Sequence, residues 1–338
     1  MPLPLLRRGA ATALTGVDPA RSLGDLHKDL HKVWVFFAVL LALRAAGPCR
    51  LPEAMGLGFA FVAAWGIAQS APSLLHRSGG DWVRAHAFVH PVTYGDTLGL
   101  GFLGGLAWLG APGARPRARR WVLAGLALLG LALALSQTRG AFLGLLAGFA
   151  ALCAAHRGFR PWLKWALPAA VLGAAAFMLL PSHRAAITGL WDPQSAIRAN
   201  QWNRVILWDV AWRAFQDHPW LGVGPANYAT VFSRYFQGLM EGIPVWSSAH
   251  NILLQQLAER GIVGLAALLT LGAALLAQAW RRCRVEPTAL TLWGFAATAG
   301  FFVMNLTESA FQNEQIATMF LFIWALGQAG AEGAAPRI

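Results

Sequence analysis

Long runs of apolar residues recur through this sequence and favour a bundle of membrane-spanning helices over any other fold. A helix that crosses the hydrocarbon core of a bilayer needs about 20 residues. We predict nine such spans, near residues 33–46, 54–71, 89–111, 121–137, 140–155, 163–180, 250–279, 288–306 and 315–330. The predicted fold class is therefore all-α, a polytopic membrane protein with about nine transmembrane helices.

The sequence carries too little charge for a surface that faces water. Only 12% of its 338 residues are Asp, Glu, Lys or Arg, about half of the roughly 25% typical of soluble domains. The lipid bilayer is therefore an expected partner. The formal net charge of +12 would indicate nucleic acid in a soluble protein. Here much of the excess arginine lies in short loops between apolar runs, so we expect no nucleic-acid partner.

One long segment interrupts the apolar runs. Residues 181–249 are mixed polar and aromatic, and they predict a large extramembrane loop with a helix from about residue 197 to residue 217. The chain then divides into an N-terminal extramembrane segment (1–32), transmembrane helices (33–180), the loop (181–249), and a final set of transmembrane helices with a short C-terminal tail (250–338).

The arginines of the short loops predict the orientation in the membrane, because cytoplasmic loops are enriched in Lys and Arg. Loops 112–120, 156–164 and 280–287 are basic, whereas the turn 307–314 has no Lys or Arg. This turn and the large loop are therefore predicted to face the periplasm. The same count places the basic residues 1–32 outside. Either one span is miscounted, or the chain lacks earlier spans that would fix its topology; we favour the second explanation.

Arg139 is a candidate functional residue because it lies between two apolar runs, in the sequence Ser-Gln-Thr-Arg-Gly of residues 136–140. A guanidinium at the membrane edge is costly without a partner. No acidic residue lies within four positions on either side. The alternative is an arginine that extends to the interface, and local spacing does not decide between the two.

The predicted loop helix carries two arginines with different surroundings. Arg213 has Asp209 four residues before it and Asp217 four residues after it, so both carboxylates can pair with it on one helix face. Arg204 has no acidic residue at these spacings. A planar guanidinium suits phosphate, so Arg204 is a candidate anion-binding residue. The alternative is a solvated arginine on an exposed face.

His250 directly precedes the long apolar run 251–279, with Ser247 and Ser248 as candidate N-caps. The positive end of the helix dipole favours a neutral imidazole. A neutral imidazole can accept a proton, as a general base must. The alternative is a histidine that caps the helix or forms hydrogen bonds at the membrane interface.

Taken together and in order, four blocks resemble the O-antigen ligase and O-antigen polymerase family. Residues 84–98, which include His90-Pro91 and Gly95, are similar to the family's span before the basic loop, and the resemblance covers roughly residues 80–330. The four blocks are SQTRG (136–140), RVILW (204–208), DHPWLGVG (217–224) and HNILLQQLAERGIVG (250–264).

The resemblance implies a GT-C-like membrane glycosyltransferase of the bacterial inner membrane, with its active site facing the periplasm. It implies transfer of a glycan from undecaprenyl diphosphate to an acceptor hydroxyl, with lipid A–core as the favoured acceptor. The family usually has about twelve spans, and residues 18–32 resemble the periplasmic stretch before its fourth span. We therefore expect this chain to lack the first few spans.

The resemblance also implies roles for single residues. Arg139 and Arg204 would hold the lipid diphosphate, and His250 would act at the acceptor hydroxyl. Preorganised guanidinium groups can stabilise the charge that develops on a leaving diphosphate, and the sequence has no clustered-carboxylate site. We therefore expect an inverting reaction without a metal or other cofactor. The candidate supporting residues are Arg198, Asn251 and Glu259.

Other functions remain open on the sequence alone. An O-antigen polymerase, or a protein O-oligosaccharyltransferase that glycosylates protein hydroxyls, would use the same diphosphate site with another acceptor. A membrane transporter is the alternative from a different class of protein. Transporters tend to carry ionisable residues in mid-span and to have inverted repeats. The spans predicted here are nearly free of central charge, which favours the glycosyltransferase.

Overall fold

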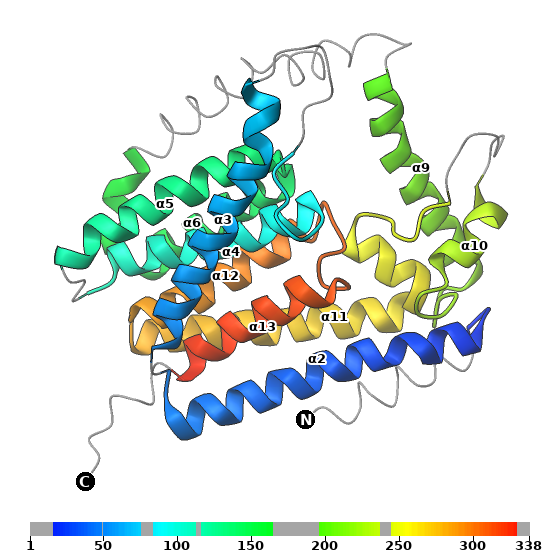
Figure 1. The fold of residues 1–338 in the computed structure, drawn as a ribbon. Coiled ribbons are helices and arrows are strands. Elements are labelled where there is room, and N and C mark those ends of the chain that lie inside the picture. Colours follow the sequence, from blue (N-terminus) through cyan, green and yellow to red (C-terminus); the bar gives the residue numbers. More distant parts are fainter. Residues whose placement is uncertain are drawn as a thin grey trace. The chain divides into compact units, whose positions relative to one another are not determined.

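A computed structural model describes residues 16–48, 50–75, 84–112, 116–164, 196–236 and 245–329 (Figure 1). Helix accounts for 81% of these described residues, which contain no strand. The all-α fold class predicted from the apolar runs is confirmed.

Within the described residues, eight of the nine predicted spans coincide with helices. They are α2 (Pro19–Ala46), α3 (Leu51–Leu75), α4 (Pro91–Gly110), α5 (Pro116–Ser136), α6 (Arg139–Ala155), α11 (Ile252–Val285), α12 (Ala289–Met304) and α13 (Glu314–Ala329). The predicted span 163–180 lies largely outside the described residues. Of the predicted loop, the described parts contain α9 (Ala196–Asp217) and α10 (Tyr228–Tyr235). The loop helix expected near residues 197–217 is thus confirmed.

Three described helices are long and apolar enough to cross a membrane. They are Leu51–Pro72, Ala118–Ser136 and Ile252–Val285, while α6 and α12 are apolar but shorter. Membrane helices of this length and composition are typical of a multi-pass membrane protein. The number of nine spans stays a prediction.

The chain forms two compact units, which are described separately. The loop unit comprises residues 1–27 and 160–270, and the bundle unit comprises residues 28–159 and 271–338. In the bundle unit, α12 packs against α4, α6 and α13, and α4 packs against α5 and α6. Residues of α2 and of α11 belong to both units.

The contact between α6 and α12 depends on glycines spaced four residues apart. A side chain added at Gly144 would lie 2.8 Å from the carbonyl oxygen of Gly300, and one at Gly148 would lie 2.9 Å from that of Ala296. Small residues at this spacing let the backbones of membrane helices approach closely. The two helices therefore pack at a separation that no larger residue at these positions permits.

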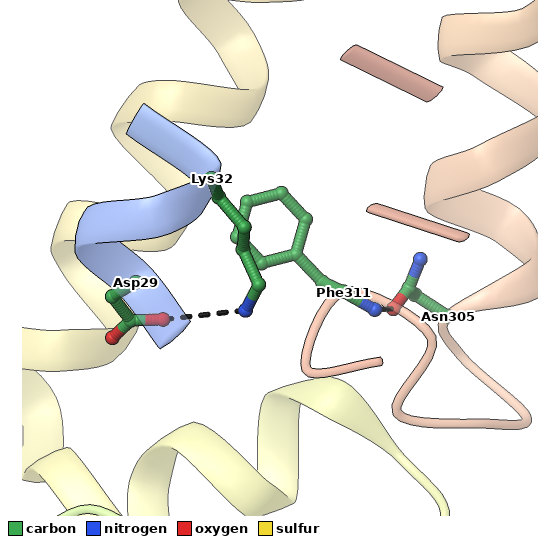
Figure 2. Close-up of polar contacts among 4 residues, drawn as sticks. All are labelled: Asp29, Lys32, Asn305 and Phe311. Carbon is green, nitrogen blue, oxygen red and sulfur yellow. Dashed lines mark hydrogen bonds and ion pairs between the residues drawn. The ribbon is translucent and has the colours of Figure 1, made fainter. Parts of the chain in front are cut away.

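Lys32 is one of the basic residues that made the predicted N-terminal orientation hard to explain, and its charge is paired. Its Nζ lies 3.3 Å from a carboxylate oxygen of Asp29 and over the ring of Phe311, 5.9 Å from the centroid (Figure 2). The Phe311 amide donates to Oδ1 of Asn305 at 2.7 Å. Only 6% of Lys32 is exposed. A buried, paired lysine is a poor orientation signal, which explains why it does not oppose the predicted topology.

The loop unit has its own apolar core between α9 and α10. The buried side chains include Leu207 and Val210 of α9 and Tyr228 and Phe232 of α10. The hydroxyl of Tyr228 donates to the carbonyl of Leu207 at 2.7 Å, so the largest core residue has its polar atom satisfied. Burial raises the pKa of the Tyr228 phenol, which keeps it neutral.

Two turns of the loop unit interlock through their backbones, and we call this the glycine junction (residues 219–224 and 258–263). The helix α11 is broken at Gly261, where φ is 61° and ψ is −164°. The break leaves helix carbonyls and amides without their usual partners. The amides of Val223 and Gly224 donate to the carbonyls of residues 258 and 259, both at 2.9 Å. In return, the amide of Ile262 donates to the carbonyl of Pro219 at 2.9 Å.

The N-terminal segment completes this part of the loop unit. The amide of Val17 donates to the carbonyl of Val223 at 2.8 Å, and Nδ2 of Asn227 donates to the hydroxyl of Ser22 at 2.8 Å. Groups joined by such hydrogen bonds cannot lie on opposite sides of a membrane. Residues 17–22 therefore pack with the loop in one unit, and the side of the membrane on which they lie stays a prediction.

Candidate functional site

Arg139 is the first residue of α6, directly after the two-residue tip that follows the end of α5 at Ser136. The two helices coincide with the spans predicted at 121–137 and 140–155. Gln137, in the tip, has a φ of 56°, a conformation that few residues other than glycine adopt. Strained tips of this kind persist only where neighbouring groups fix them. The Arg139 side chain is exposed at the start of the helix.

Arg84 is the group that fixes the tip. Its Nε donates to the carbonyl oxygen of Ser136 at 2.7 Å, and its Nη2 donates to the hydroxyl of Thr138 at 3.4 Å. Thr138 in turn donates to the carbonyl of Pro91 at 3.0 Å. Arg84 was missed as a site residue because it lies 52 residues before Ser136, a separation at which local spacing carries no signal.

The electrostatic surroundings of Arg84 include both a cation and an anion. Burial lowers the pKa of its guanidinium, the Glu308 carboxylate raises it, and Arg139 lowers it. Arg84 and Arg139 are therefore near enough to repel each other. Two guanidinium groups at one helix tip make a local positive field, and such a field favours an anionic ligand.

Two glycines of the sequence blocks make room for the tip. A side chain at Gly95 would lie 2.4 Å from the hydroxyl oxygen of Thr138, and one at Gly140 would lie 2.4 Å from that of Thr307. The threonine side chains occupy the space that a larger residue would need. These glycines therefore set how closely the tip approaches α4 and the turn after α12.

In the loop unit, α9 carries Arg204 toward the segment that contains His250. Trp208 lies one helical turn after Arg204, and its Nε1 donates to the carbonyl oxygen of Ala249 at 3.1 Å. Ala249 directly precedes His250. The structure thus brings the surroundings of two predicted site residues together, although the chain separates them by about 45 positions. Arg139 belongs to the bundle unit.

The segment at His250 differs from the sequence prediction. The helix α11 begins at Ile252, and the side chain of Asn251 accepts hydrogen bonds from the amides of Leu253 and Leu254 at 3.0 and 3.1 Å. Asn251 is therefore the N-cap, and the expectation of Ser247 or Ser248 was wrong. An asparagine one position from the helix satisfies its free amides better than a more distant serine can.

His250 itself lies outside the helix in a left-handed conformation, with φ at 48°. Its amide donates to the hydroxyl of Ser248 at 3.1 Å, and its ring packs edge-on against Trp246, with 5.6 Å between the centroids. The imidazole is therefore held at the start of α11 by its own backbone geometry and by an aromatic neighbour.

Two buried side chains of α11 support this segment. Oε1 of Gln255 accepts a hydrogen bond from the amide of Ala249 at 2.6 Å, and Oε1 of Glu259 accepts one from the amide of Tyr228 at 3.2 Å. Gln255 also hydrogen-bonds the Glu259 carboxylate. Glu259 therefore stabilises the start of α10.

The prediction for Arg213 is confirmed in part. Its Nε lies 2.7 Å from Oδ2 of Asp209, as the spacing indicated. Asp217 instead lies beside the hydroxyl of Tyr235; burial chiefly, and this carboxylate, raise the pKa of that phenol. Asp217 is the last residue of α9, where the chain already turns away from Arg213. Arg198 lies in the first turn of α9, and its side chain is outside the described residues.

The two groups of residues suit different chemical tasks. The tip with Arg84 and Arg139 presents cationic donors that can bind a phosphate-like anion. The segment with Arg204 and His250 combines an arginine with an imidazole, which can accept or donate a proton near neutral pH.

The family model described as O-antigen ligase matches residues 124–269, which contain Arg139, Arg204 and His250. No curated protein matches the chain. The match agrees with the resemblance of the four sequence blocks, all of which lie within the matched residues. Residues 124–269 of this chain are therefore similar to the O-antigen ligase family.

Proposed function

We propose that this protein transfers a glycan from undecaprenyl diphosphate to an acceptor hydroxyl at the periplasmic face of the bacterial inner membrane, with lipid A–core as the acceptor. The family match supports glycan transfer of the ligase or polymerase type. The observation that carries the proposal is the hydrogen bond from Trp208 to the carbonyl of Ala249. It places the helix of Arg204 against the residue that precedes His250.

The proposed reaction is a direct displacement. The acceptor hydroxyl attacks the anomeric carbon of the glycan, and its proton passes to the imidazole of His250. The glycosidic C–O bond breaks, and undecaprenyl diphosphate leaves with the bonding electrons. Direct attack from the opposite face inverts the anomeric configuration.

Arginines would stabilise the leaving group in this reaction. Negative charge grows on the diphosphate as the bond breaks, and preorganised guanidinium groups stabilise such charge more strongly in the transition state than in the ground state. Arg139 and Arg204 are the proposed donors. Arg84, which hydrogen-bonds the tip that precedes Arg139, would keep one of them in place.

The decisive experiment examines lipopolysaccharide from a strain in which the gene is deleted. A ligase predicts complete core with no attached O-antigen chains. A polymerase of the same fold predicts that one repeat unit remains attached, and unchanged lipopolysaccharide would contradict both. Complementation with the intact gene should restore the long chains.

Site variants test the residue roles in the same strain. Arg204→Ala should abolish transfer, and Arg204→Lys should restore little, because a point charge does not replace a bidentate guanidinium. The matched control is Arg213→Ala on the same helix, whose pair with Asp209 is exposed to solvent and contributes little to stability. His250→Ala should bind radiolabelled undecaprenyl diphosphate but form no product. An active Arg204→Ala beside an inactive, folded Arg213→Ala would contradict the assignment.

A further inference from the structure

We propose that Gln255 and Trp208 are positioning residues for His250, which fix the backbone before it and thereby set the direction of its imidazole. The inference rests on the proposed function, in which His250 accepts the proton of the acceptor hydroxyl. Gln255 and Trp208 come from different helices, α11 and α9. They act on the same residue, Ala249.

Both backbone polar groups of Ala249 are engaged. Its N–H donates to Oε1 of Gln255 at 2.6 Å, and its carbonyl oxygen accepts from Nε1 of Trp208 at 3.1 Å. Ala249 is fully buried. A buried backbone group that loses its partner is destabilising, so these bonds strongly favour one orientation of the residue before His250.

The backbone of His250 shows why this orientation needs support. A φ of 48° lies in the left-handed region, which is unfavourable for an L-residue. Such a conformation persists only where its surroundings over-determine it. If Ala249 is released, His250 can return to a negative φ, and that rotation swings its Cβ and imidazole away from their present direction.

Gln255 is itself fixed by further buried groups. Only 1% of its surface is exposed, and it hydrogen-bonds the Glu259 carboxylate one turn later. Glu259 accepts from the amide of Tyr228 at the start of α10. A continuous set of hydrogen bonds thus runs from α10 through α11 to the residue before His250. This set gives Gln255 a defined position from which to hold Ala249.

Two conservative variants remove one bond each. Gln255→Met keeps the length of the side chain but removes the acceptor for Ala249, and Trp208→Phe keeps an aromatic ring but removes the indole donor. The matched controls are Gln256→Met and Trp212→Phe. Gln256 is equally buried and follows Gln255, and Trp212 lies one turn after Trp208 on α9. Within the described part of the chain, the side chain of neither control residue makes a hydrogen bond.

Three quantities are measured for each variant. The first is the maximal transfer rate in membrane vesicles that hold native lipid-linked donor and lipid A–core. The other two are the affinity for radiolabelled undecaprenyl diphosphate and the thermal stability. We expect both test variants to lower the maximal rate by about tenfold to a hundredfold, because a misplacement of about 1 Å costs this much. Donor affinity should stay at the level of the two controls, and thermal stability should fall only by what one unpaired backbone group of Ala249 costs.

The outcomes separate this inference from the proposed function. If His250→Ala still transfers glycan at the parent rate, the proposed role of His250 is wrong and the positioning role fails with it. If His250→Ala is inactive while Gln255→Met and Trp208→Phe match their controls, only the positioning role is wrong. A loss of donor affinity and stability in proportion to the loss of rate would show a merely structural role and would also overturn the inference.

Discussion

Gly261 is the position in the loop unit at which an added methyl group should lower stability most. It has φ 61° and ψ −164°, a region that is open almost only to glycine. A Cβ added there would lie 2.3 Å from both the carbonyl carbon and the carbonyl oxygen of Trp220. These are backbone atoms, so they cannot rotate out of the way as the end of a side chain could.

The expected loss of stability follows from two contributions. Holding an alanine in this conformation costs about 1–3 kcal/mol. The displaced backbone of residues 219–221 also stretches the hydrogen bonds of the glycine junction, each of which is worth about 0.5–1.5 kcal/mol. Together these two contributions should lower the free energy of unfolding by about 3 kcal/mol or more. A loss of this magnitude should lower the melting temperature of a domain of this size by about 6–12 °C.

The assay combines thermal unfolding in detergent with hydrogen exchange. Gly261→Ala should lower the melting temperature, and the amides of Val223 and Gly224 should exchange faster because their acceptors at residues 258 and 259 move away. The matched control is Gly24→Ala in α2, where an added Cβ has no atom within 4 Å. That variant should be as stable as the parent or more stable by about 0.5–1 kcal/mol.

A specific result would refute this reasoning. If Gly261→Ala melts with the parent and the amides of Val223 and Gly224 remain protected, the break in α11 does not depend on glycine. The junction would then be maintained by side-chain packing and not by the exchange of backbone hydrogen bonds.

Three further predictions concern the tip, the topology and the chemistry. Arg84→Met should lower transfer with little loss of protein level, because the tip before Arg139 loses two charged hydrogen bonds worth about 1.5–3 kcal/mol each. The measurement is the rate of transfer per folded protein, and a rate equal to that of the parent would contradict the prediction. A topology reporter fused after Arg157 or Arg282 should report a cytoplasmic location, and one inserted near Gly238 should report a periplasmic location. A cytoplasmic location for Gly238 would invert the predicted topology. Glycan transfer by the purified protein should continue in EDTA, because guanidinium groups are proposed to stabilise the leaving diphosphate. A loss of transfer in EDTA that is reversed by adding a divalent ion would contradict this mechanism.

The helices were the part of the structure most open to prediction from the sequence. Apolar runs of sufficient length force a helix in lipid, since each backbone polar group must be satisfied within the segment. The pair of Arg213 and Asp209 was predictable for a related reason, because residues four apart are neighbours on a helix. Both signals are local in the chain.

The features that escaped prediction depend on contacts between distant segments or on competition between neighbours. Arg84 reaches Ser136 across 52 residues, and nothing in the spacing of either block indicates that bond. The left-handed conformation of His250 follows from Ala249, whose two partners lie on separate helices. Several residues before α11 are of types that cap helices, and only the position of the first helical turn decides which of them is the N-cap.

The glycine junction has a consequence for how such sequences can diverge. Its hydrogen bonds join backbone to backbone, so they are indifferent to the side chains of Val223, Ile262 and their neighbours. Substitution can therefore alter most of residues 219–224 and 258–263 without breaking the connection. Three glycines of the junction are constrained: Gly222 and Gly261, where an added Cβ would meet the opposite backbone at 2.3 Å, and Gly224, where φ is 97° and an added Cβ would lie 2.7 Å from the Cα of Gly16. Distant homologues should consequently share these glycines long after the residues around them have ceased to align.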